Sequence, residues 1–171
     1  MSGTEERRQE PDEHARRWEQ VEEAVERLQE GAVEEAIERL GHLAEEHPEN
    51  EYVWFFLGQA CFERERWDKA LKGYVEALAR APRFLGAMIG AGHCLLRLGK
   101  PEKALRMARQ ALLAERDDTD ALYLLGMAHL QMGRLHAAAE AFERFLAGRP
   151  ELEVALEVRA ILERIRPDER G

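Results

Sequence analysis

The sequence predicts an all-α protein in which pairs of helices stack into a solenoid that ends in a C-terminal capping helix. The first observation is a repeat of 34 residues, in which alanine, glycine and proline recur in a fixed phase. The second is the spacing of apolar residues at three- and four-residue steps, which is typical of amphipathic helices. The third is composition, because 45% of the 171 residues are hydrophobic, which is close to the globular average.

Small residues and prolines mark the copies of the repeat. They are Ala36, Ala70, Ala104 and Ala138; Gly58, Gly92 and Gly126; Gly31, Gly99 and Gly133; and Pro48, Pro82 and Pro150. Glu65 replaces one glycine of the second copy, and Arg116 replaces the proline of the third. These phases place the copies at 17–50, 51–84, 85–118 and 119–152, between an N-terminal segment, 1–16, and a C-terminal segment, 153–171.

The N-terminal part of the chain is acidic, unlike the rest. Residues 1–50 hold 16 acids and 6 bases, a net charge of −10, within a total of −9. Residues 1–16 show no apolar periodicity and are expected to form a charged tail, with at most a short frayed helix. From Trp18 to Leu28 apolar residues follow helical spacing, with glutamates on the opposite face. The acidic segment is either a solvated face or a separate functional surface.

Each copy is expected to fold as a helix, a tight turn and a second helix. In the third copy the first helix spans about 86–98, Gly99 takes the left-handed conformation that ends it, and Pro101 begins the second helix. The repeated alanines lie midway along the second helix, where a small side chain lets two helices approach closely. The glycines inside the first helices cost about 1 kcal/mol each, so they are expected to serve packing.

The copies resemble the tetratricopeptide repeat. The second copy carries most of its pattern, through Trp54, Leu57, Gly58, Ala70, Tyr74, Ala77 and Pro82. The fourth copy is similar, and the third has Met88 where tryptophan is usual. The first copy keeps only its second half, so it is either a degenerate repeat or a helical pair that caps the stack. The resemblance implies a right-handed superhelix whose concave surface is lined by the first helix of each copy.

A further helix is expected in the C-terminal segment. Six apolar residues of this segment share one helix face, with glutamate and arginine opposite: Val154, Leu156, Val158, Ile161, Leu162 and Ile165. The last repeat of a solenoid must shield its hydrophobic end, so this helix is expected to be a cap, followed by a short tail.

The concave surface implied by the resemblance supplies the candidate peptide-binding residues. Five positions of each copy point into the groove, and Gly90 lies on the same side of the middle helix. The candidates are Tyr52, Phe55, Gln59, Phe62, Gly86, Ile89, Gly90, His93, Arg97, Tyr123 and Met127. The surface is apolar for one that faces water, which favours a binding site, and packing between repeats is the alternative for its aromatic residues and Met127.

Gly86 and Gly90 support two interpretations. Their missing side chains predict either a depression in the groove or close packing of helices. In the first interpretation an apolar side chain of a partner inserts over Gly90, between Phe55 and Tyr123, with Arg97 available to a nearby acid.

The residue content excludes several classes of function. Ser2 is the only serine, the six histidines are scattered, no glycine-rich phosphate loop occurs, and the spacings of zinc and calcium ligands are missing. We therefore predict no catalytic residue, metal or cofactor. The net negative charge disfavours nucleic acid, and no apolar run approaches the roughly 18 residues of a membrane span. Two cysteines, Cys61 and Cys94, and no secretion signal at the start of the chain indicate the cytoplasm.

The predicted function is that of a non-catalytic adaptor that binds a partner peptide or helix in its groove. A carboxylate clamp for chaperone tails is not expected, because Gln59, His93 and Met127 stand where asparagine would be needed. The stretches 55–61 and 82–84 also resemble bacterial type III secretion translocator chaperones, which implies a chaperone that forms a homodimer through its N-terminal helix. A structural subunit that assembles through its ends is the third alternative.

Overall fold

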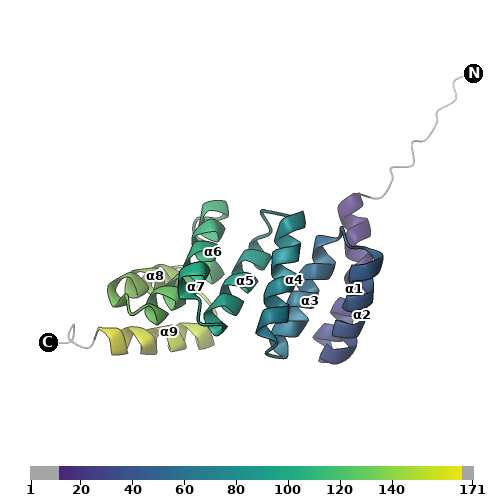
Figure 1. Cartoon of the computed structure of the whole chain (residues 1–171). Helices are drawn as coiled ribbons and strands as arrows, with labels where there is room; N and C mark the ends of the chain where they lie inside the picture. Colours follow the sequence, from purple (N-terminus) through teal and green to yellow (C-terminus); the bar gives the residue numbers. More distant parts are fainter. Residues whose placement is uncertain (1–11, 167–171) are drawn as a thin grey trace, which may run out of the picture.

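The structure is a computed structural model, and it describes residues 12–166. This part of the chain forms nine α-helices and no strand. The helices are α1 (Glu13–Gln29), α2 (Val33–Glu46), α3 (Glu51–Glu63), α4 (Trp67–Arg80), α5 (Leu85–Arg97), α6 (Pro101–Ala114), α7 (Thr119–Gln131), α8 (Leu135–Ala147) and α9 (Leu152–Ile165). They follow one another as hairpins along a single axis (Figure 1), so the predicted all-α repeat fold is confirmed.

The helices form two layers. Each helix packs against the next one in the chain, and α1, α3, α5 and α7 also contact one another in succession. Within residues 12–166, the second helices α2, α4, α6 and α8 make no contacts among themselves. The first helices therefore form a continuous inner layer, while the second helices stand apart on the outside, as in other stacked helical repeats.

The turn inside each hairpin needs a residue with positive φ. Gly31, Gly99 and Gly133 have φ values of 82°, 68° and 70°, in the left-handed region that glycine tolerates best. Glu65 occupies the same place in the second hairpin with a φ of 55°. The predicted role of Gly99 in ending α5 is therefore confirmed, and Glu65 adopts the same conformation with a side chain that disfavours it.

The small residues of the repeat lie where helices meet. The four phased alanines are fully buried at the contacts of the second helices. A Cβ on Gly58 would lie 3.1 Å from the carbonyl oxygen of Ala70 and from the ring of Tyr74, and one on Gly126 would lie 2.4 Å from the ring of Phe142. These glycines let α3 and α7 approach their partner helices, which confirms that they serve packing.

Helix α1 begins within the segment expected to be a tail. Its first residue is Glu13, and the side chain of Asp12 accepts a hydrogen bond from the backbone N–H of His14. The sequence-based tail therefore contains the first turn of a helix, whose start is favoured by the capping carboxylate. Residues 1–11, the rest of the expected tail, lie outside the described residues.

Asn50 ties α1 to the first complete repeat. This asparagine is fully buried, and its Nδ2 donates hydrogen bonds to the carbonyl oxygen of Arg17 at 2.7 Å and to Oε1 of Gln20 at 2.9 Å. Its Oδ1 accepts a hydrogen bond from the backbone N–H of Tyr52 and so caps α3. The amide nitrogen and oxygen of this buried side chain are thereby both hydrogen-bonded, and their partners lie in the first and second copies of the repeat.

Helix α9 covers the end of the solenoid. Ala155, Val158 and Ile161 are buried, and the last two pack in one cluster with Phe142 and Phe145 of α8. Residues 167–171, the short tail expected after α9, lie outside the described residues.

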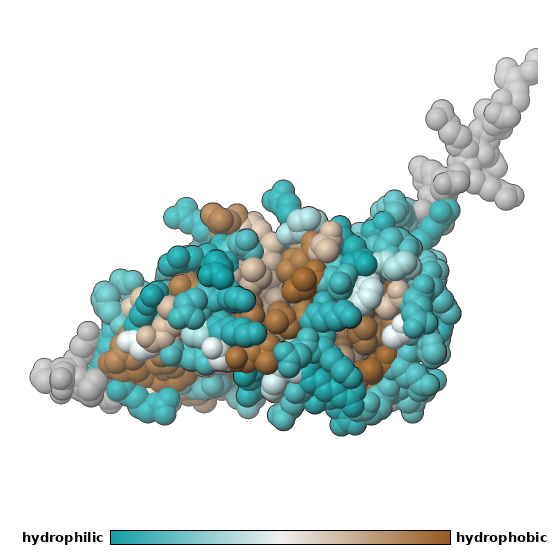
Figure 2. Space-filling view, in the orientation of Figure 1, coloured by the Kyte–Doolittle hydropathy of each residue, from teal (hydrophilic) through white to brown (hydrophobic). Residues whose placement is uncertain are grey.

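One residue of the predicted apolar face of α9 was misplaced. Leu156 is 54% exposed, and Leu152 at the start of the helix is 71% exposed. Leu156 falls 34 residues after Leu122, a buried residue of α7. In a longer solenoid the second helix of that hairpin would cover Leu156, and no helix follows α9 within residues 12–166. Figure 2 shows hydrophobic side chains in the middle of the molecule and at this C-terminal end, within a hydrophilic surface.

Across residues 12–166, none of the helices combines the length and apolar character that a membrane span requires.

Candidate functional site

Five of the predicted groove residues meet around one pocket of about 470 Å³. They are Phe62, His93, Arg97, Tyr123 and Met127, from α3, α5 and α7. Leu96, Leu130 and Gln131 complete these walls, and Glu157 of α9 closes the pocket at the C-terminal end. We call this surface of the first helices the inner groove. The repeat phase brings these residues together because equivalent positions of stacked helices face the same side.

The polar rim of the inner groove is held in place by neighbouring side chains. The guanidinium of Arg97 lies 5.0 Å from the ring centre of Trp67, and the same ring packs edge-on against Phe62. The Nε2 of Gln131 donates a hydrogen bond to the carbonyl oxygen of Leu96 at 3.3 Å. These contacts orient one cationic and one amide group beside the apolar floor.

Burial keeps two titratable groups of the groove, His93 and Tyr123, in their neutral forms near pH 7. Burial lowers the pKa of His93, with Asp120 opposing and Arg97 reinforcing that shift. Burial also raises the pKa of Tyr123, whose hydroxyl donates a hydrogen bond to Oε1 of Glu157 at 3.4 Å. The groove thus offers neutral hydrogen-bonding groups, one cation and one anion around apolar side chains. This arrangement fits a peptide better than a strongly charged ligand.

Tyr52 and Phe55 lie away from this pocket, in an aromatic cluster near α1. The Phe55 ring lies 4.6 Å from that of Phe84, and Tyr52 packs edge-on against Trp18 and Phe84. The Tyr52 hydroxyl and Nε2 of His14 also share a hydrogen bond. The contacts of these two rings therefore fit the alternative interpretation, in which they pack between copies of the repeat.

The remaining predicted positions are not part of the pocket wall. Ile89 is half-buried and packs against the cluster of Met88, Ala111 and Ala121. Gln59 is half-buried on α3, one turn before Phe62.

The predicted depression over Gly90 was wrong. A Cβ at Gly90 would lie 2.5 Å from Cζ of Tyr74, because the buried Tyr74 ring of α4 already fills this space. A Cβ at Gly86 would similarly lie 3.1 Å from the ring of Phe55. Both glycines therefore admit aromatic rings of the preceding copy, which is the packing interpretation.

Two features of the molecule were missed from sequence. Glu157 belongs to the groove because α9 continues the phase of the first helices, and its offset of 34 from Tyr123 was the available signal. His129 is a polar residue in a buried position of α7, and it lines a second pocket on the far side of that helix. The sequence signal for this site was a histidine at position 129, where the equivalent residue of the preceding copy is Leu95.

The two thiols have the environment of core residues. Cys61 and Cys94 are free and buried, and burial raises the pKa of both, that of Cys94 to about 12. Thiols held protonated in this way are poor nucleophiles. Within residues 12–166, no group of three or more histidine, cysteine or acidic side chains is placed to hold a metal ion.

Comparison with known proteins supplies a family. Models of the tetratricopeptide repeat match residues 27–83 and 89–153. The outer dynein arm-docking complex subunit 4 of Xenopus laevis is 29% identical over 96 residues, which are 56% of this chain and 18% of that protein. The chain thus spans less than a fifth of that relative's length.

Solved structures show the same fold at low identity. MamA matches with a TM-score of 0.76 and 17% identity, over 84% of this chain and 82% of that one. The first tetratricopeptide repeat domain of Spaghetti (RPAP3), bound to the HSP90 peptide SRMEEVD, matches with a TM-score of 0.61 and 22% identity. That match covers 67% of this chain and 92% of the other.

Proposed function

Because the chain belongs to the tetratricopeptide repeat family, we propose that it is a non-catalytic adaptor that holds a segment of a partner protein in its inner groove. The observation that carries this proposal is the pocket of about 470 Å³ between α3, α5, α7 and α9. Its floor is apolar and its rim presents Arg97, Gln131 and Glu157. The related RPAP3 domain, solved with a bound peptide, supports the use of this fold for peptides.

The partner segment is expected to carry one apolar anchor and one nearby acidic side chain. The anchor enters between Phe62 and Met127, where burial of apolar surface supplies most of the binding energy. The acid lies next to Arg97, which is exposed at the rim. Ordering of a linear segment opposes binding, so we expect a dissociation constant in the micromolar range.

Selection of random peptides by display on the full chain tests this proposal. We expect enriched peptides to pair an apolar with an acidic residue, and their binding to fall about tenfold or more when Met127→Glu places a charge on the groove floor. Arg97→Glu changes an exposed side chain whose guanidinium stacks on Trp67, so it should weaken the same peptides with only a small fall in melting temperature. The matched control is Val75→Glu, at an exposed position of α4 that lines neither this groove nor the pocket described in the next subsection.

Two results would contradict this proposal. Peptides that bind both groove variants and the Val75→Glu control with equal affinity would place the binding site elsewhere. Failure to enrich any peptide would remove the support for a linear partner segment.

The secretion-chaperone alternative requires a second copy docked on the N-terminal helix. In the structure, α1 buries Val21, Ala24, Val25 and Leu28 within its own chain, and Trp18 at 39% exposure is its large exposed apolar side chain. Light scattering of the full chain and of Trp18→Ser tests this alternative. A dimer that the substitution dissociates would support it. A mass that grows with concentration would support an assembly subunit instead.

We also propose the cytoplasm as the location, because both thiols are free and buried. A reducing compartment keeps such thiols unpaired. Recovery of a fluorescent fusion in the soluble cytoplasmic fraction of the native cell tests this proposal, and recovery in a secreted fraction would overturn it.

A further inference from the structure

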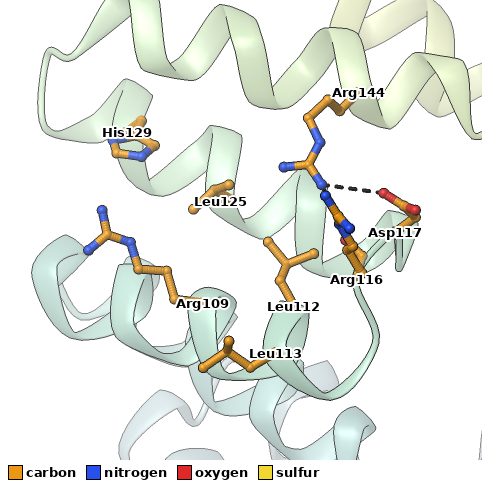
Figure 3. Close-up of a pocket in the computed structure, with 8 residues that line it drawn as sticks. All are labelled: Arg109, Leu112, Leu113, Arg116, Asp117, Leu125, His129 and Arg144. Atoms are coloured by element: carbon orange, nitrogen blue, oxygen red, sulfur yellow. Dashed lines mark hydrogen bonds and ion pairs between the residues drawn. The ribbon is translucent and has the colours of Figure 1, made fainter.

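A second pocket lies on the side of α7 opposite the inner groove. It has a volume of about 740 Å³ and is lined by residues of α6, α7, α8 and the connection between α6 and α7 (Figure 3). Leu125 and His129 each follow a groove residue, Tyr123 and Met127, by two positions. Two residues turn a helix by about 200°, so this pocket, the outer pocket, faces away from the groove.

Three arginines surround the outer pocket. Arg109 comes from α6, Arg116 from the connection after α6, and Arg144 from α8. Among the described residues, Arg109 and Arg116 have no ion-pair partner, and Arg144 contacts Asp117 at 3.4 Å, a carboxylate that is 83% exposed. Figure 3 shows Arg116 and Arg144 beside this carboxylate and Arg109 apart from them, toward His129, so the pocket holds an excess of positive charge in an otherwise acidic protein.

His129 supplies a second, independent observation. This residue is only 8% exposed, and its Nδ1 has no hydrogen-bond partner in the described part of the chain. Burial lowers the pKa of the imidazole, Arg134 and Arg109 reinforce the shift, and Glu140 opposes it. A buried polar atom without a partner is uncommon in a folded protein, and at a pocket wall it indicates a place that a ligand completes.

The equivalent positions of the other copies hold none of this charge. Moved back by 34 residues, the three arginines fall on Val75, Pro82 and Gln110, and His129 falls on Leu95. The basic set therefore does not arise from the repeat itself. It belongs to the gap between α6 and α8 alone within the described hairpins.

Apolar side chains complete the outer pocket. Leu112 and Leu125 form its walls with Leu113, which is 88% exposed at the rim. Leucine exposed to that degree beside arginine side chains offers a surface for an apolar residue next to an acidic one.

We propose that the outer pocket binds a segment of a partner protein in which a carboxylate side chain stands beside an apolar one. The carboxylate lies at the end of the pocket that holds Arg109, whose guanidinium can present paired N–H donors to its oxygens, on the same side as the unpaired Nδ1 of His129 (Figure 3). The apolar neighbour covers Leu113. This site is separate from the inner groove, so the protein joins two partner segments, one on each side of α7.

The test uses a short peptide that alternates leucine and glutamate, with a matched peptide in which glutamine replaces glutamate. Titration of each into the isotopically labelled full chain is followed through the Nε–H signals of the arginines and the ring signals of His129. We expect the glutamate peptide to shift these signals in a saturable and salt-sensitive way, and to raise the pKa of His129 by adding negative charge nearby. The glutamine peptide is expected to leave them in place.

Substitutions locate the site. Arg109→Gln and Leu113→Ser change exposed side chains, so folding is preserved, and each should weaken the glutamate peptide by about tenfold. Arg106→Gln is the matched control, because it removes the same charge from an exposed position of α6 outside the pocket. Met127→Glu in the inner groove should also leave this binding unchanged.

Three results would overturn the proposal. The first is equal binding of the glutamine peptide. The second is an equal response of the same signals to inorganic phosphate at the same concentration, which would show a general anion site. The third is self-association that Arg109→Gln abolishes, which would assign the pocket to a second copy of this chain.

Discussion

Gly73 marks the tightest backbone contact between helices in the first complete repeat. A Cβ added there would lie 2.7 Å from the backbone nitrogen of Gly58 and 2.8 Å from the carbonyl oxygen of Trp54. Ordinary contact begins at 3.4 Å, so Gly73→Ala forces α3 and α4 apart by about 0.7 Å. The three nearest neighbours are backbone atoms, which cannot rotate away as a flexible side chain can.

The expected effect of Gly73→Ala is a balance of two contributions. Alanine favours the helix by about 1 kcal/mol, while overpacking costs about 1–3 kcal/mol, with the upper end fitting a backbone clash. We expect a net loss of about 2 kcal/mol, or a fall in melting temperature of about 4–8 °C for a chain of this size.

Gly41→Ala is the matched control. A Cβ at Gly41, inside α2, meets no atom within 4 Å, so only the helix preference remains and the melting temperature should rise by about 2–4 °C. Thermal unfolding followed by far-ultraviolet circular dichroism measures both variants. Equal stabilisation by the two substitutions would refute the assignment of Gly73 to a close helix contact.

Three further predictions concern single residues. Glu65→Gly should stabilise the protein by about 1 kcal/mol, measured by urea unfolding, because Glu65 holds a positive φ of 55°; an unchanged or lower midpoint would contradict this. Gly90→Leu should lower the melting temperature, since its side chain meets the Tyr74 ring, and a stability equal to wild type would restore the predicted depression. Stability should fall as the pH drops below about 6.5, because the lowered pKa of His93 lets the unfolded chain bind more protons than the folded one. His93→Gln should reduce this fall between pH 7.5 and 5 in thermal unfolding, and an identical pH profile would argue against it.

Much of the fold was predictable because each copy contacts only its neighbours. A residue such as Ala70 must be small at the same place in every copy, and a residue such as Gly99 must permit a left-handed turn. Such local requirements repeat with the period of the chain, and they are visible without knowledge of distant contacts. The two layers of helices follow from that period.

The candidate site was only partly predictable, because side chains reach across copies. Phase places Gly90 on the inner side of α5, but it does not show that Tyr74 extends from α4 into the space above it. Met127 and Phe62 line one pocket, since both follow the phase of the first helices. The start of α1 was placed late because Asp12, which caps it, was read as part of a charged tail.

The outer pocket lay beyond sequence reasoning for a related reason. His129 occupies a position where Leu95 is buried in the preceding copy, so the pattern predicts a core residue. Its neighbours Arg109 and Arg144 belong to different copies, and only the stacking of α6, α7 and α8 brings them to one place.

The central claim is that a partner segment binds in the inner groove, and the methyl signals of methionine report on it directly. Met127 lines the groove, whereas Met107 and Met132 lie outside the pocket wall and pack against the cluster of Leu95, Ala104, Leu105 and Ala128. A methyl-labelled chain titrated with the peptide selected by display should show a saturable shift of the Met127 signal, with the other two nearly unchanged. Saturable binding that leaves the Met127 signal in place would contradict the account.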